Sequence, residues 1–412
     1  MAVTSLALVL VLGLAADHVS RRLRLPGLVG MLLVGLALGP KGLDWLSPQL
    51  LGVSADLRQV ALVVILLRAG LMLRRETLQR LGWRVIALGT VPLGLEAAAV
   101  ALLAPSLLGL RGLEAALVGT MTAAVSAAVV VPAMAGLADR LEGRDQDLPM
   151  LVLAATPLDN TCSVLLFASL LDLRGLQGAG QIAEHLWRLP VAVLTGAVVG
   201  GLLGWVLYRV FHHHNPRATK RTLIMVSLAV LLLAAEQALR GIVPFSGLAA
   251  TLAMGLALTD RSDTFGAEVA TKLSKVWVFA EVALFVLLGA MVDPQPALQV
   301  GLHGAILLAI GLTVRSVGAW LCLAGSPFSK PQRALGMACG VPKATVQAAV
   351  GATPLMLGFP GGQSILAMAV LCILLTAPLG AVLIDLLTRR AFPREKESTR
   401  GALAASAGQS EG

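Results

Sequence analysis

Residues Leu153–Phe167 read LAATPLDNTCSVLLF and decide the fold, because they place an ionisable Asp159 inside an apolar segment. That segment runs from Leu148 to about Asp172. Asp159 therefore lies about eleven residues, or roughly 17 Å, into a hydrocarbon core about 30 Å thick. A carboxylate at this depth is costly unless a partner compensates its charge, so an intramembrane acid usually marks a functional site. The alternative is a structural carboxylate that a neighbouring helix satisfies.

The composition is that of a polytopic helical membrane protein. Of the 412 residues, 57% are hydrophobic and only 13% are charged, and the mean hydropathy is +0.84. Soluble globular proteins carry about 25% charged residues. The apolar residues recur in segments of about 20, the length of a transmembrane helix. We predict thirteen spans, with approximate limits 2–20, 26–40, 57–73, 83–108, 113–136, 148–172, 187–210, 219–239, 244–259, 275–292, 296–322, 333–357 and 362–388.

The loop charges predict the orientation. With the N-terminus outside, and with basic residues at the ends of spans counted with the adjoining loops, the inside loops and the C-terminal tail hold 23 of the 32 lysines and arginines, the outside loops hold 6, and 3 lie deep within spans. This asymmetry obeys the positive-inside rule and predicts a multi-pass protein of the cell inner (plasma) membrane with a cytoplasmic C-terminus. Residues 389–412 are polar and small, and we expect a disordered cytoplasmic tail. The basic residues form no continuous patch, so the net charge of +9 does not indicate a nucleic-acid partner.

Motifs of the common catalytic and cofactor-binding classes are absent from the sequence. It contains no Walker-type loop, dinucleotide fingerprint, nucleophile elbow or paired-histidine metal motif. We therefore expect neither an enzyme nor a bound cofactor. The four cysteines lie inside apolar spans without paired spacing, and we interpret them as packing residues.

Two spans carry polar residues together with helix breakers. In the fifth span, Ser126 is followed by a run of valines and by Pro132, and the sequence predicts a helix that breaks there. In the twelfth span, Gly340, Pro342 and Lys343 fall together near the centre. Interrupted helices in corresponding positions of two halves point to a transporter site. The alternative is an ordinary kink, but a kink needs no lysine.

Further charged residues lie deep in other spans. Glu96 and Arg315 lie within the fourth and eleventh spans, and Glu281 lies nearer the inner part of the tenth. With Asp159 and Lys343 they make a near balance of acids and bases, and opposite charges buried in lipid are expected to pair. A purely structural role for these residues is the alternative.

The sequence resembles the monovalent cation:proton antiporters, in particular the branch of the NHA-type sodium/proton exchangers. The motifs that carry the resemblance are LPGLVG at 25–30, ILLRAGL at 65–71, VS at 125–126 with VVVP at 129–132, and above all PKATVQAA at 342–349. The resemblance implies an NhaA-like fold of inverted repeats with two crossed broken helices and an elevator-like motion. It also implies a homodimer in the lipid bilayer.

The resemblance also implies a domain division within a transmembrane domain of residues 1–388. The core that binds the ion would be residues 83–172 and 296–388. The dimerisation and scaffold part would be residues 1–73 and 219–292, and residues 187–210 would link the halves.

By position, the acidic pair of the family falls on Asp159 and Asn160. Oxygen ligands for Na⁺ or Li⁺ would come from the cation- and proton-binding residues Asp159, Asn160, Thr156 and Ser126. A core charge network would consist of Glu96, Arg315 and Lys343, with Glu96 as the partner of Lys343. The broken-helix positions would be Pro132, Gly340 and Pro342.

This chain departs from the family pattern at two positions. The family branch usually has a second aspartate where Asn160 stands, and a proline where Ala127 stands. One carboxylate can be neutralised by a proton or by a cation, but not by both, and this competition couples the two fluxes. With a single acid at the pair, we expect electroneutral one-for-one exchange of Na⁺ or Li⁺ for H⁺.

Two other functions stay open at this point. A sodium-coupled symporter of organic anions could share the inverted-repeat architecture. A protein that does not transport would explain Asn160 directly, and an ion pair between Arg315 and Asp159 would favour it.

Overall fold

The computed structural model describes residues 2–23, 27–72, 79, 81–138, 140–141, 143–174, 179–239, 242–291 and 294–393. These residues form helices and loops, with no strand among them. Nine helices of this described part are long and apolar enough to cross a membrane, and two shorter apolar helices cover 27–38 and 59–72. The predicted class, an all-helical membrane protein with many spans, is confirmed. The count of thirteen spans stays a prediction.

The helices follow one another in the order α1 (Ala2–Arg22), α2 (Gly27–Leu38), α3 (Pro48–Gly52), α4 (Ser54–Met72), α6 (Trp83–Leu108), α7 (Leu113–Ala123), α8 (Ala127–Ala138), α9 (Asp147–Asp172), α10 (Ala179–His214), α11 (Ala218–Ala238), α12 (Gly247–Arg261), α13 (Asp263–Ala290), α14 (Pro294–Leu323), α15 (Lys330–Ala338), α16 (Thr345–Val350), α17 (Thr353–Met356) and α18 (Gly362–Ala391). The residues that lie outside the described part include Arg24, Leu25, Pro26, Arg74, Arg75, Arg80 and the tail from Arg394 onward.

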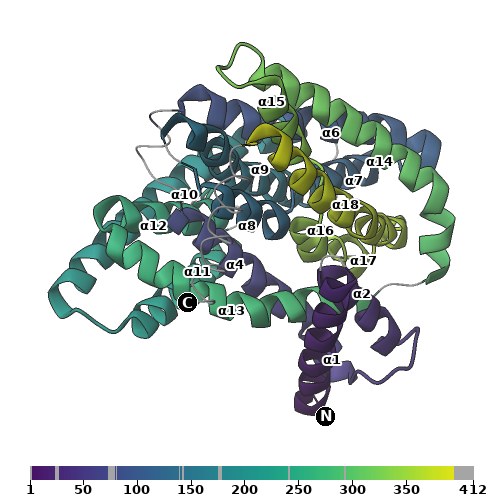
Figure 1. Ribbon diagram of the computed structural model, residues 1–412. Coiled ribbons are helices and arrows are strands. Elements are labelled where there is room, and N and C mark those ends of the chain that lie inside the picture. Colours follow the sequence, from purple (N-terminus) through teal and green to yellow (C-terminus); the bar gives the residue numbers. More distant parts are fainter. Residues whose placement is uncertain are drawn as a thin grey trace, which may run out of the picture.

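The helices pack in two groups. In one group α6 packs against α7, α9 and α14, and α18 packs against α14 and α15. In the other group α13 packs against α2 and α4, and α12 packs against α4 and α10. Figure 1 shows α13 along the lower edge of the molecule beneath α4 and α11, while α9, α18 and α6 lie above them. The residues 282–288 of α13 are at most 2% exposed, as expected for a stretch of helix that is apolar on every side.

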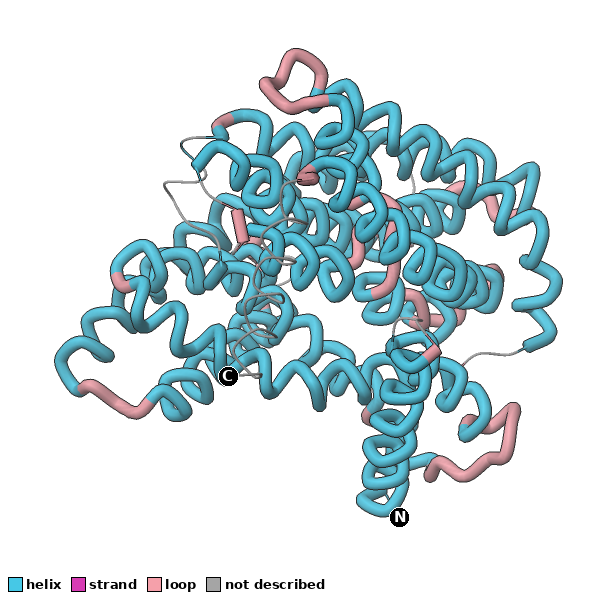
Figure 2. The backbone as a smooth tube through the Cα atoms, viewed as in Figure 1, coloured by secondary structure: helices cyan, strands magenta, loops and turns pink. Residues whose placement is uncertain are grey.

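Two membrane-length segments are interrupted inside the bundle. Helix α7 ends at Ala123 and α8 begins at Ala127, and helix α15 ends at Ala338 while α16 begins at Thr345. Figure 2 shows these non-helical segments among the helices rather than at the periphery. The second break contains Gly340 and Pro342, as the sequence predicts.

Pro132, one of the predicted broken-helix positions, does not lie at the first break. Pro132 lies inside α8, whereas the chain leaves the helix at Ala124–Ser126. A proline within a helix removes one backbone hydrogen bond. The helix ends instead where groups from other segments replace its backbone bonds, because an unsatisfied amide is costly in an apolar interior. Ala127, which stands where the family usually has proline, is the first residue of α8, a position that tolerates proline but does not need it.

Helix α18 packs directly on the second break. A Cβ atom at Gly380 would stand 2.6 Å from the Cδ atom and 2.8 Å from the backbone nitrogen of Pro342. The two backbones can therefore approach this closely only because residue 380 has no side chain.

We expect Gly380→Ala to lower the free energy of unfolding of the purified protein by about 1–3 kcal/mol, because the added methyl group must push α18 away from the break. The measurement is the melting temperature in detergent. Gly201→Ala on α10 is the matched control, since a Cβ atom there would meet nothing within 4 Å. Equal melting temperatures for the two variants would contradict the close packing.

Candidate ion-binding site at the crossed helix breaks

The two helix breaks meet in the interior of the bundle. The amide of Ser126 in the first break donates a hydrogen bond of 2.7 Å to the carbonyl of Pro342 in the second. From α16, the Nε2 atom of Gln347 donates to the carbonyls of Met121 at 2.7 Å and Ala124 at 3.0 Å. Each break thus supplies partners for backbone groups that the other leaves without a helical partner.

Charged side chains satisfy the helix ends that the first break leaves open. The carbonyl of Ala123, at the end of α7, accepts hydrogen bonds from Arg315 at 2.5 Å and from Lys343 at 3.0 Å. The amide of Val125, just before α8, donates to Oδ1 of Asp159 at 2.9 Å. Cations at a helix C-terminus and anions at a helix N-terminus match the partial charges there. The positions of Arg315, Lys343 and Asp159 are therefore fixed by the backbone groups of the break as well as by the ion pairs among charged side chains.

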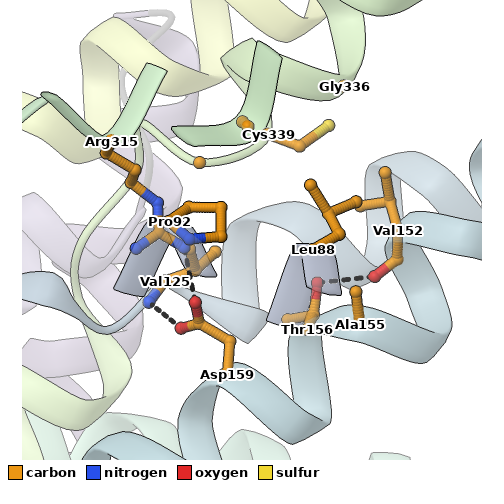
Figure 3. Close-up of a pocket in the computed structure, with 12 residues that line it drawn as sticks. Leu88, Pro92, Val125, Val152, Ala155, Thr156, Asp159, Arg315, Gly336 and Cys339 are labelled. Carbon is orange, nitrogen blue, oxygen red and sulfur yellow. Dashed lines mark hydrogen bonds and ion pairs between the residues drawn. The ribbon is translucent and has the colours of Figure 1, made fainter. Parts of the chain in front are cut away.

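Four buried ionisable residues form one network. Arg315 of α14 contacts Asp159 of α9 at 2.5 Å and Glu96 of α6 at 3.1 Å, and Lys343 of the second break contacts Glu96 at 2.6 Å. None of the four is more than 4% exposed. Two acids and two bases make the network neutral, which reduces its cost in an apolar interior. Figure 3 shows Arg315 reaching to one side of the Asp159 carboxylate while Val125 lies on the other.

Helix α9 presents its site residues to two separate spaces. Asp159 and Thr156 line a pocket of only about 30 Å³ beside Arg315, and the Thr156 hydroxyl donates to the carbonyl of Val152 at 2.8 Å. Asn160 lines a different cavity of about 240 Å³. Successive residues of a helix point about 100° apart, so the two members of the pair face different surroundings. The predicted cation ligands are therefore not all in one space.

Oxygen atoms without a hydrogen-bond partner lie in the first break and on the helices α6 and α9. They include the side-chain oxygens of Ser126 and Asn160 and the Oε1 atom of Glu96, all buried. Buried polar atoms without partners are rare in folded proteins and each needs an explanation. Free oxygens beside a carboxylate are the donor set that a small, hard cation prefers.

Two of the predicted broken-helix residues act through the backbone. A Cβ atom at Gly340 would stand 2.8 Å from Nε of Arg315, so the absence of a side chain leaves room for the guanidinium. Pro342 contributes the carbonyl that receives the Ser126 amide. Pro132 lines the larger cavity together with Asn160.

Sequence reasoning missed one polar contact of the second break. The hydroxyl of Thr376 on α18 accepts a hydrogen bond of 2.8 Å from the backbone amide of Lys343. A single threonine in a long apolar helix gives no signal of this role. Gln347 was visible within the PKATVQAA motif, but its bonds to the first break depend on how the two segments cross.

Membrane-length helices that break where buried opposite charges meet define a secondary transporter for ions or small charged solutes. The family model described as "Sodium/hydrogen exchanger, transmembrane" matches residues 6–389. The chain therefore belongs to the sodium/hydrogen exchanger family, within the monovalent cation:proton antiporter superfamily, whose members are transporters rather than enzymes.

Known proteins agree with this membership. The chain is 32% identical over 392 residues to the sodium/hydrogen exchanger 9B2 of Mus musculus, covering 91% of this chain and 70% of that one. It is 30% identical to the exchanger of the same name from Homo sapiens, with 91% and 71% covered. The structure matches the sodium proton antiporter MjNhaP1 from Methanocaldococcus jannaschii with a TM-score of 0.80 at 22% identity, covering 95% of this chain and 98% of that one. At this identity the match shows the fold alone.

We expect Glu96→Gln to lower the free energy of unfolding by about 3–5 kcal/mol, because it leaves two buried cations to share one carboxylate. The measurement is again the melting temperature in detergent. Asp385→Asn is the control, since Asp385 pairs with Arg389 on the surface, where the two side chains are 60% and 63% exposed. Such surface pairs contribute at most about 1 kcal/mol. A loss no greater than that of the control would show that the network does not stabilise the fold.

Proposed function

We propose that the protein is a secondary antiporter that exchanges Na⁺ or Li⁺ for H⁺ across the membrane. The observation that carries the proposal is the position of Asp159, whose carboxylate binds the Val125 amide of the first helix break and the Arg315 guanidinium. A proton and a small cation would compete for this carboxylate. Oxygen ligands near it would come from the Thr156 and Ser126 hydroxyls and from carbonyls of the breaks.

Arg315 must release Asp159 before a cation can replace it. One guanidinium nitrogen of Arg315 already donates to Oε2 of Glu96, and Oε1 of Glu96 has no hydrogen-bond partner. Glu96 can therefore accept the nitrogen that leaves Asp159. This supports an exchange in which Arg315 turns fully to Glu96 when Asp159 takes a proton or a cation.

The same residues support an electroneutral exchange. Asn160 does not titrate, and an arginine keeps its proton at any working pH. Asp159 would then be the one group of the pair that carries either ion. The network has the same total charge with a proton on Asp159 as with a monovalent cation there, so one-for-one exchange moves no net charge.

The proposed motion is elevator-like. Helices within residues 83–172 and 296–388 would form the moving core, and residues 1–73 and 219–292 the scaffold and dimer surface, with residues 187–210 as the linker. The packing of α6 on α7, α9 and α14, and of α13 on α2, α4 and α12, supports this division. We place the protein in the inner (plasma) membrane as a homodimer with the N-terminus outside. We also retain the thirteen spans and the NhaA-like inverted repeats as part of this proposal.

The test of exchange uses proteoliposomes with an internal pH dye. We expect external Na⁺ or Li⁺ to alkalinise the lumen through the wild-type protein, and Asp159→Asn to abolish the signal because it removes the competing charge. Asp385→Asn, the same change at an exposed site, should retain wild-type rates. No cation-driven alkalinisation by the wild type at any pH would refute the antiport, and full activity of Asp159→Asn would remove Asp159 from the mechanism.

Electroneutrality has its own measurement. We expect the initial rate of exchange to be unchanged when valinomycin and a potassium gradient impose a membrane potential of either sign, since one-for-one exchange carries no net charge. A rate that rises with one sign of the potential and falls with the other would show an electrogenic stoichiometry.

The contact between Arg315 and Asp159 is the observation that favours a protein that binds the cation without transporting it. Such a protein would show Na⁺-dependent thermal stabilisation and no exchange. A symporter of organic anions would instead take up its substrate independently of the proton gradient.

A further inference from the structure

A cavity of about 240 Å³ lies between the two groups of helices. One wall comes from α8 and α9, including Asn160, and the other from α1, α4 and α13, including Arg68 and Glu281. A cavity of this size holds several water molecules. Asp159 is not among the residues that line it. A hydrated cation in this cavity therefore meets other groups before it meets Asp159.

Two oxygen-bearing side chains in this cavity have no part in the charge network at the breaks. The Oδ1 atom of Asn160 is buried without a hydrogen-bond partner, and the residue is 4% exposed. Among the described residues that line the cavity, Glu281 is the only acid. It stands inside a membrane-length helix, where an ionised carboxylate is costly unless its charge is compensated.

Positive and negative side chains surround Glu281, but none of them forms a salt bridge with it. Its charged neighbours are Arg21, Asp17 and Arg68. Arg21 is held by Asp17 at 2.8 Å. Neither arginine lies within the 4.0 Å that defines a salt bridge to Glu281. These four residues sum to zero when Glu281 is ionised and to one positive charge when it is protonated, so ionisation of Glu281 removes the net positive charge that would repel a cation from the cavity.

We propose that Glu281 and Asn160 form a cation-binding station in this cavity, in which Glu281 supplies from α13 the carboxylate that position 160 lacks. The ligands are the Glu281 carboxylate, the Asn160 amide oxygen and water, a set of hard oxygen donors suited to Na⁺ or Li⁺. A proton on Glu281 excludes the cation. The inference rests on the proposed exchange function, since the station would hold the ion before it passes to Asp159.

The station makes Glu281 a determinant of cation affinity. We expect Glu281→Gln to raise the Na⁺ concentration for half-maximal exchange by about tenfold, because the neutral amide no longer offsets the arginines of the cavity. Lys275→Gln, which neutralises one exposed charge on the same helix, is the control and should leave that concentration unchanged. An unchanged half-maximal concentration in Glu281→Gln would overturn the proposal.

The double variant Glu281→Gln with Asn160→Asp provides a rescue test. It keeps one carboxylate in the cavity but moves it from α13 to α9, so we expect Na⁺ affinity to recover toward the wild-type value. A residue with a merely structural role at 281 would not be rescued from position 160. Failure of the double variant to recover, with both single variants folded, would contradict the shared site.

A binding measurement separates this inference from the exchange itself. Na⁺-dependent thermal stabilisation of the purified protein reports binding whether or not exchange occurs. We expect Asp159→Asn to retain part of this stabilisation and Glu281→Gln to reduce it. If the wild type shows no exchange but is stabilised by Na⁺, and Glu281→Gln is not, the result supports the cation-binding station and contradicts the antiport. Equal stabilisation in the wild type and Glu281→Gln would reject the station alone.

Discussion

Helix breaks inside a membrane leave backbone carbonyls and amides without partners, and the rest of this structure depends on how those groups are satisfied. At the end of α7 the Ala123 carbonyl receives both Arg315 and Lys343, and just beyond it the Val125 amide is bound by Asp159. The break thus dictates where positive and negative charges must stand. The charges required by the fold are the same charges that ion exchange would use, so loss of stability and loss of transport must be measured separately.

The neighbouring residues Asp159 and Asn160 face two different surroundings. The amide at position 160 therefore affects the charge of the larger cavity and not the charge of the buried network. Asp159 belongs to the neutral network with Glu96, Arg315 and Lys343. Asn160 faces the larger cavity instead. A second aspartate at position 160 would therefore add its charge to the cavity rather than to the network. An asparagine at position 160 therefore leaves the charges at the two helix breaks unchanged and alters only the charge of the larger cavity.

The sequence alone predicts the helical membrane class and the deep charged residues, because long apolar segments and isolated charges within them are local signals. It also predicts the break at Gly340 and Pro342. It names Pro132 as a position of the first break, but Pro132 lies inside α8, since a proline marks only a lost amide whereas the actual break involves the Pro342 carbonyl from a distant segment. The sequence also does not predict which of Asp159 and Asn160 faces the cavity, because this depends on the rotation of α9 about its axis relative to the neighbouring helices.

The choice of arginine at position 315 follows from the number of contacts it must make. One guanidinium nitrogen reaches Glu96 and the Ala123 carbonyl, and the other reaches Asp159. A lysine offers a single nitrogen on a flexible stem and could not hold the same fork of partners. Because its contacts are divided between two nitrogens, Arg315 can give up Asp159 while it stays bound to Glu96 and to the end of α7. The carboxylate can thus be released without leaving a buried cation unpaired, which is the condition that an exchanging site in an apolar interior must meet.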